Sequence, residues 1–181
     1  MNLAAGAPFW LVALLCVALV AAAVEDVLRL KISNVTVVAV IATALIGMGT
    51  LGFTPSVWEN FAVFGGLLVV GTFLFSSGIM GGGDIKLFAA VGLWVDLQHA
   101  ALLIATVLIA GGLLAVAFLV PRLAARRSNG GPWRDRKKDV PYAVAIAMGA
   151  FFFVALQHQA SARDSNPLEF HPLEPAPNSQ A

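Results

Sequence analysis

The sequence predicts an all-α protein with about six transmembrane helices, and its composition and its long apolar runs carry this prediction. Of 181 residues, 59% are hydrophobic and only 12% are charged, whereas soluble domains carry about 25% charged residues. The apolar residues come in long runs, and a helix needs roughly 20 of them to cross the hydrocarbon core of a bilayer. Open strands cannot satisfy their backbone hydrogen bonds in lipid, so each run is interpreted as a helix.

Six apolar runs follow one another along the chain. No basic residue precedes the first run, which is therefore interpreted as a retained helix and not as a cleavable signal peptide. The fourth run is short for a full crossing. Proline marks the predicted end of the fifth at Pro121 and the predicted start of the sixth at Pro141. The predicted spans are about 8–24, 35–51, 57–75, 85–95, 99–120 and 141–157.

The basic residues predict an orientation. Arg29 and Lys31 follow the first predicted span, Lys86 begins the fourth, and the segment 121–140 carries seven more. If six spans alternate, these 2 + 1 + 7 = 10 of the 11 basic residues lie on one side. The positive-inside rule places that side in the cytoplasm and both termini outside.

The chain divides into two predicted regions at the end of the sixth apolar run. Residues 1–157 form the predicted membrane domain. Residues 158–181 hold four of the nine prolines and few apolar residues, a composition that cannot bury enough apolar surface to fold. They are therefore predicted to be a disordered exterior tail.

Asp84 is the candidate functional residue that stands out, because it follows Gly81, Gly82 and Gly83 between two strongly apolar segments. A carboxylate next to hydrocarbon is costly and is rarely kept without a function. Glycines have no Cβ, so backbone and substrate can approach such a carboxylate closely. Two structural alternatives stay open: Asp84 as the N-cap of the fourth helix, and the glycines as a packing surface or a turn.

Asp26 is the predicted partner of Asp84, because alternating spans place both at cytoplasmic helix ends. Two carboxylates that share a proton can activate water and polarise a peptide carbonyl, with one of them acting as general base. Asp26, like the neighbouring Glu25, has the simpler alternative of ending a helix at the interface. Asp96 lies roughly 18 Å from Asp84 along a helix, and Glu59 belongs to the opposite interface, so neither fits the same site.

Other chemistries find little support. The three histidines show no metal-ligand spacing and no cysteine pair exists, so neither a metal nor a cofactor is predicted. The glycine run lacks the Gly-Lys-Ser or Gly-Lys-Thr ending of a phosphate loop. The basic segment 121–140 contains one aromatic residue, Trp133, which is too little to indicate nucleic acid. This segment either anchors the topology or contacts anionic headgroups of the lipid bilayer.

Three motifs together resemble those of one known family. The first is GGGDIKL at 81–87, and the second is DVLRLKISN at 26–34, with Asp26 and Asn34 in register. The third is DVPYAVAIAMGA at 139–150. They resemble, in turn, the GxGD signature, the first-aspartate motif and the start of the last helix in the type IV prepilin peptidases, six-helix membrane aspartyl proteases.

The resemblance implies a specific function. Asp26, chosen over Glu25 by the motif spacing, and Asp84 would be catalytic. The glycines Gly81, Gly82 and Gly83 would support the loop or the substrate, together with Lys86 and Asn34. The enzyme would cut the leader of a prepilin or pseudopilin at the cytoplasmic face of the bacterial inner membrane. The paired cysteines of the family's methyltransferase region are absent, as in the short peptidases of tight-adherence (Flp-type) pilus systems.

Two residues depart from the family pattern, and two alternatives stay open. Ser33 stands where the family usually has proline, and Leu28 stands where arginine is common. Both affect the first loop, and neither removes a carboxylate.

The first alternative function is that of another GxGD protease, of the preflagellin or signal-peptide type. The only tyrosine, Tyr142 in the sixth predicted span, counts against the signal-peptide type. The second is a non-catalytic membrane subunit of a pilus or secretion system.

Overall fold

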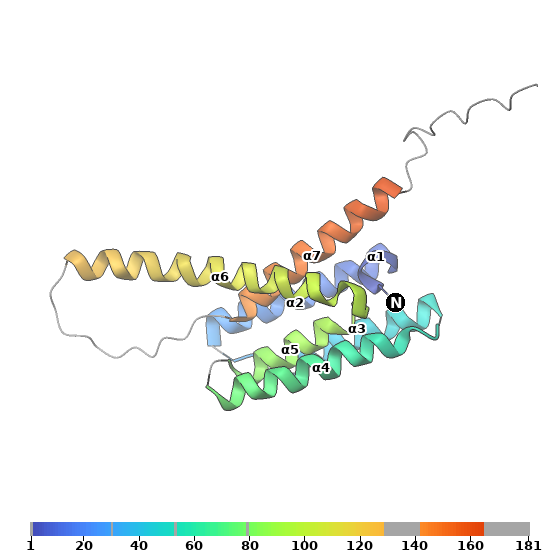
Figure 1. Cartoon of the computed structure of the whole chain (residues 1–181), viewed down its shortest axis with the longest axis horizontal. Coiled ribbons are helices and arrows are strands. Elements are labelled where there is room, and N and C mark those ends of the chain that lie inside the picture. The colour runs from blue at the N-terminus through green and yellow to red at the C-terminus, as the bar shows by residue number, and fades with distance from the viewer. Residues whose placement is uncertain (1, 30, 53, 79, 129–141, 165–181) are drawn as a thin grey trace, which may run out of the picture.

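In a computed structural model of the chain, the described residues are 2–29, 31–52, 54–78, 80–128 and 142–164. All regular secondary structure in these ranges is helical. The helices are α1 (Leu3–Gly6), α2 (Phe9–Arg29), α3 (Asn34–Leu51), α4 (Val57–Ser76), α5 (Gly82–Gly92), α6 (Leu97–Ser128) and α7 (Tyr142–Asp164). Figure 1 shows α2 to α6 running roughly lengthwise through the molecule, with α7 inclined to α6.

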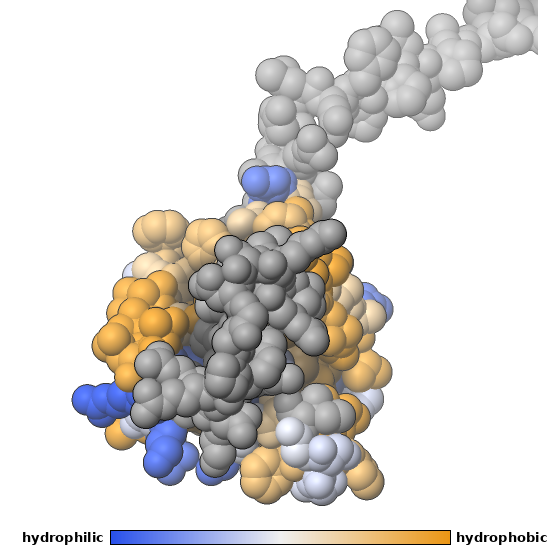
Figure 2. Space-filling view, turned by 90° about the vertical axis from the view of Figure 1, so that its left-hand side faces the viewer, coloured by the Kyte–Doolittle hydropathy of each residue, from blue (hydrophilic) through white to orange (hydrophobic). Residues whose placement is uncertain are grey.

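Four helices are long and apolar enough to cross a membrane, namely α2, α3, α4 and the Leu97–Ala117 part of α6. A shorter apolar stretch, Tyr142–Gln157, lies in α7, and α5 has only 11 residues. Apolar side chains cover much of the outer surface in the view of Figure 2, as expected for helices that face lipid. These features fit a multi-pass membrane protein, while the predicted number of six crossings stays a prediction.

Three helix ends lie five or more residues beyond the sequence prediction, and the first is that of α2, which continues past residue 24 to Arg29. The fifth predicted helix does not stop at Pro121, because α6 continues to Ser128. Proline removes one backbone donor, but arginine, leucine and alanine follow it, and these are strong helix formers. The last helix, α7, continues past Gln157 to Asp164. The remaining parts of the predicted basic segment and tail, 129–140 and 165–181, lie outside the described residues.

The helix that carries Asp84 is α5, and it lies at the centre of the packing. It contacts α3, α4 and α7, and seven of its eleven residues are buried. Gly71 on α4 permits close contact, because a Cβ added there would lie 2.3 Å from Cγ2 of Ile85. A helix that is buried on nearly all sides has little freedom to shift, so the packing holds the start of α5 in place.

The far end of α5 is capped by two other elements. The N–H groups of Leu3 and Ala4 in α1 donate to the Trp94 carbonyl at 3.0 and 3.2 Å. The side-chain amide of Asn60 on α4 donates to the Leu93 carbonyl at 2.9 Å. Helix ends leave carbonyls without an intrahelical partner, so these bonds satisfy groups that burial would otherwise penalise. The four-residue α1 has no counterpart in the sequence prediction, because it is too short for a hydropathy pattern.

Replacing Gly149 by alanine is predicted to weaken the packing of α6 on α7. A Cβ at Gly149 would lie 2.5 Å from the Cα of Val107, so the two backbones would have to separate. We expect a destabilisation of about 1–3 kcal/mol, measured as a lower Tm in detergent. Gly112→Ala is the matched control, because nothing lies within 4 Å of its Cβ position. Equal Tm values for the two variants would contradict this packing.

Candidate active site

Asp26 lies in the last turns of α2, and its side chain is buried. The backbone N–H of Ala143 donates to its Oδ2 at 2.9 Å. Ala143 is the second residue of α7, where N–H groups have no intrahelical partner and the helix carries a partial positive charge. The start of α7 therefore stabilises a negative charge on Asp26, a residue 117 positions away in the sequence.

Asp84 is the third residue of α5, and its side chain is also buried. Gly81 is the N-cap of this helix, and its backbone makes a hydrogen bond to the Asp84 carboxylate. A side chain at the third position that binds the N-cap backbone is one half of a capping box. The alternative of Asp84 as the N-cap itself is therefore wrong, although the residue does help to cap the helix.

The two carboxylates, here called the carboxylate pair, interact with each other. The charge of Asp26 acts on Asp84, although the residues are 84 − 26 = 58 positions apart. The Oδ1 atom of Asp84 is buried, and no hydrogen-bond partner reaches it from the described residues. Such an oxygen is costly to bury when ionised. A proton on Asp84 would relieve both this cost and the mutual repulsion.

The three glycines before Asp84 have different neighbours. A Cβ at Gly81 would lie 2.7 Å from Oδ2 of Asp84, and one at Gly83 would lie 3.2 Å from the Cβ of Ile32. At Gly82 the nearest atom would be 3.5 Å away, on Phe75, which is ordinary contact. Glycine at position 81 is therefore required for the close approach to Asp84. A side chain at position 83 would need Ile32 to shift by a few tenths of an ångström, and position 82 has room for one.

Comparison with protein families gives one match. The type IV leader peptidase family matches residues 13–119, which include both members of the carboxylate pair. The chain belongs to the type IV leader peptidase family. The searches of curated proteins and of solved structures found no match. Membership in this family of leader peptidases indicates a membrane-embedded peptidase with a protein substrate.

Two further residues of the predicted site meet at the edge of the peptidase's carboxylate pair. The Lys86 ammonium donates to Oδ1 of Asn34 at 3.4 Å, and both side chains are exposed. Arg29 and Lys31 are exposed as well. Lys86 thus joins the first turn of α5 to the first residue of α3, while the buried Asp84 faces inward.

Asp96 and Glu59 lie at the other end of α5, away from the pair. Asp96 accepts hydrogen bonds from the backbone and the ring of His99 at 3.1 and 2.6 Å. Glu59 accepts the Leu97 N–H at 3.3 Å. Both carboxylates cap the start of α6, a structural use that explains them without catalysis. Within the described residues, no group of His, Cys, Asp and Glu suits a metal ion.

Two contributors to the candidate site were not predicted from the sequence. One is the Ala143 N–H, which no side-chain pattern reveals, although the Pro-Tyr start of the last helix located the segment. The other is Glu25, which the sequence analysis set aside as an interfacial residue. Its Oε2 accepts two hydrogen bonds, from the Ser33 N–H and from the Thr36 hydroxyl, each at 2.9 Å.

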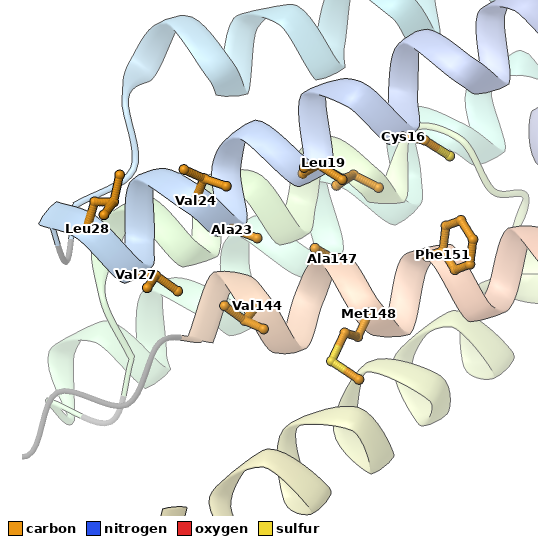
Figure 3. Close-up of a pocket in the computed structure, with 11 residues that line it drawn as sticks. Cys16, Leu19, Ala23, Val24, Val27, Leu28, Val144, Ala147, Met148 and Phe151 are labelled. Atoms are coloured by element: carbon orange, nitrogen blue, oxygen red, sulfur yellow. The ribbon is translucent and has the colours of Figure 1, made fainter.

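An apolar groove of about 460 Å³ runs between α2 and α7 (Figure 3). Its lining includes Ala23 and Val27 from α2 and Val144 from α7, and no carboxylate lines it. Figure 3 shows these side chains between the two ribbons. The groove is therefore an apolar surface that neither member of the carboxylate pair lines.

Replacing Gly81 by alanine is predicted to displace the Asp84 carboxylate and to reduce peptidase activity. The new Cβ would take the space of Oδ2 at 2.7 Å, and a misplacement of about 1 Å can cost roughly 100-fold in rate. Initial rates of leader cleavage measure the effect. Gly82→Ala, with its nearest neighbour at 3.5 Å, is expected to lose far less. A similar loss in both variants would argue against a steric effect at Gly81.

Proposed function

We propose that this protein is an aspartic endopeptidase that cleaves the leader peptide of a prepilin or pseudopilin. The observation that carries the proposal is the carboxylate pair, two buried aspartates that interact within a membrane-embedded bundle. Membership in the type IV leader peptidase family supports the same reaction. The resemblance to the short peptidases of tight-adherence pilus systems supports a prepilin of the Flp type as the substrate.

The geometry supports different roles for the two aspartates. Asp26, which accepts the Ala143 N–H, is the ionised member and acts as general base. It removes a proton from water as the water oxygen attacks the scissile carbonyl carbon. Asp84, with one buried oxygen that no described donor reaches, holds the proton and hydrogen-bonds the carbonyl oxygen. The tetrahedral intermediate collapses when the leaving nitrogen takes the proton from Asp26.

The cytoplasmic face of the inner membrane is the proposed location of this chemistry. The end of α2 and the start of α5, which carry the pair, lie toward the same end of the bundle, on the left of Figure 1. Arg29, Lys31 and Lys86 are exposed near these helix ends. Basic residues favour the cytoplasmic side, so a leader would be cut there and both termini would be exterior.

Replacing either member of the pair by asparagine is predicted to abolish processing. The amide keeps the size of Asp26 or Asp84 but cannot exchange the proton, and loss of general acid–base catalysis costs about 100-fold or more. Co-expression with a candidate prepilin, followed by gel mobility, measures cleavage. Asp96→Asn is the matched control, because this residue caps α6 at the far end. Undiminished cleavage by either pair variant would contradict the assignment of Asp26 and Asp84 as the catalytic pair.

The proposed orientation predicts a labelling pattern for single cysteines. In a Cys16→Ser background, Ser56→Cys lies at the start of α4 and Lys31→Cys follows α2. A membrane-impermeant maleimide added to spheroplasts is expected to label position 56 and to reach position 31 only after the membrane is opened. Labelling of position 31 in sealed spheroplasts would reverse the orientation.

A further inference from the structure

Glu25 is next to Asp26 in sequence but faces a different neighbour. Successive helical residues point about 100° apart, so Asp26 contacts the start of α7 while Glu25 contacts the start of α3. The Glu25 carboxylate is partly buried, and its Oε2 atom accepts the Ser33 N–H and the Thr36 hydroxyl, both at 2.9 Å. One carboxylate oxygen of α2 thus binds both the N-cap and the third residue of α3.

These bonds complete a helix cap from outside the helix. Ser33 is the N-cap of α3, and its Oγ accepts the Val35 N–H at 3.1 Å. In a capping box, a Glu or Gln at the third helical position binds the N-cap N–H. Here the third position is Thr36, which is too short for that role, and Glu25 supplies the carboxylate from α2.

The capped segment leads directly to the glycines before Asp84. Ile32, next to Ser33, packs against the main apolar core. The space of a Gly83 Cβ lies 3.2 Å from the Ile32 Cβ and 3.6 Å from its backbone nitrogen. Contacts therefore run from Glu25 through Ser33 and Ile32 to Gly83, the residue before Asp84. Both ends of this path adjoin the carboxylate pair.

The residue at position 33 decides whether this path exists. Proline, which the family resemblance leads one to expect there, has no backbone N–H and could not donate to Glu25. Serine supplies both that N–H and the hydroxyl that caps α3. Ser33, which stands where the family usually has proline, therefore makes a hydrogen bond to Glu25 that proline could not make.

We propose that Glu25 is a positioning residue, which holds the segment 31–33 against Gly83 and so sets the separation of Asp26 and Asp84. The inference rests on the proposed function, since it names what fixes the geometry of the same reaction. Glu25 itself contacts neither the substrate nor the reacting atoms. Its carboxylate acts only through the two hydrogen bonds to Ser33 and Thr36.

Kinetics of the purified full-length chain with a leader-bearing prepilin test the proposal. Glu25→Ala removes both bonds and is expected to lower kcat about 10- to 100-fold with little change in KM. Glu25→Gln keeps an acceptor oxygen and is expected to retain most activity. Glu59→Ala is the matched control, because it also removes a carboxylate that accepts the first N–H of another helix. It is expected to leave kcat near wild type.

Two kinetic outcomes overturn the positioning role. One is a kcat for Glu25→Ala within about twofold of wild type, because mispositioned reacting groups cost far more. The other is an equal loss in Glu59→Ala, since this would indicate general destabilisation. No cleavage by the wild type would count against the proposed function itself, and a second measurement then tests the positioning alone.

That measurement needs no substrate. In a Cys16→Ser background, Ile32→Cys with Gly83→Cys places two Cβ atoms 3.2 Å apart. A shift of a few tenths of an ångström brings them to the roughly 3.5–4.5 Å that a disulfide requires. With Glu25 present, mild oxidation is expected to cross-link them rapidly. Adding Glu25→Ala should slow the cross-link several-fold, whereas adding Glu25→Gln should not. An unchanged rate with Glu25→Ala overturns the proposal, whether or not any substrate is cleaved.

Discussion

The central constraint on this structure is the cost of holding two carboxylates together in an apolar interior. Each must be reached by donors, and the donors available inside a helical bundle are the unpaired N–H groups of helix starts. Asp26 uses the start of α7, and Asp84 uses the N-cap of its own helix, α5. The site therefore lies where one helix ends and two others begin, because only such a junction supplies backbone donors to both residues.

The remaining packing serves to keep this junction fixed. α5 is buried on nearly every side, and α1 and Asn60 satisfy the carbonyls at its far end. Because α5 is anchored at its far end, its start cannot slide along the bundle without breaking those bonds. The glycines then permit the loop after α2 to approach this start. Anchoring the far end of α5 thus holds Asp84, near its start, in a fixed position.

The sequence predicted the parts of the fold that depend on composition alone. The six apolar runs each coincide with a helix, because burial in lipid requires long apolar segments whatever their neighbours. The end of α6 was wrong, since a single proline removes only one hydrogen bond and the residues after Pro121 favour helix. The four residues of α1 gave no signal, although their N–H groups cap α5.

The sequence predicted the two carboxylates of the candidate site, but not the backbone N–H group that binds Asp26. The distribution of basic residues predicted that Asp26 and Asp84 lie at the same membrane depth. The motif spacing favoured Asp26 over Glu25 as the partner of Asp84. The Ala143 N–H lies beyond residue 119, where the family match ends. A fragment that stopped there would keep both Asp26 and Asp84, yet Asp26 would lack its backbone donor. The smallest unit able to hold the charge of Asp26 in place therefore extends into α7, beyond the residues that the family match covers.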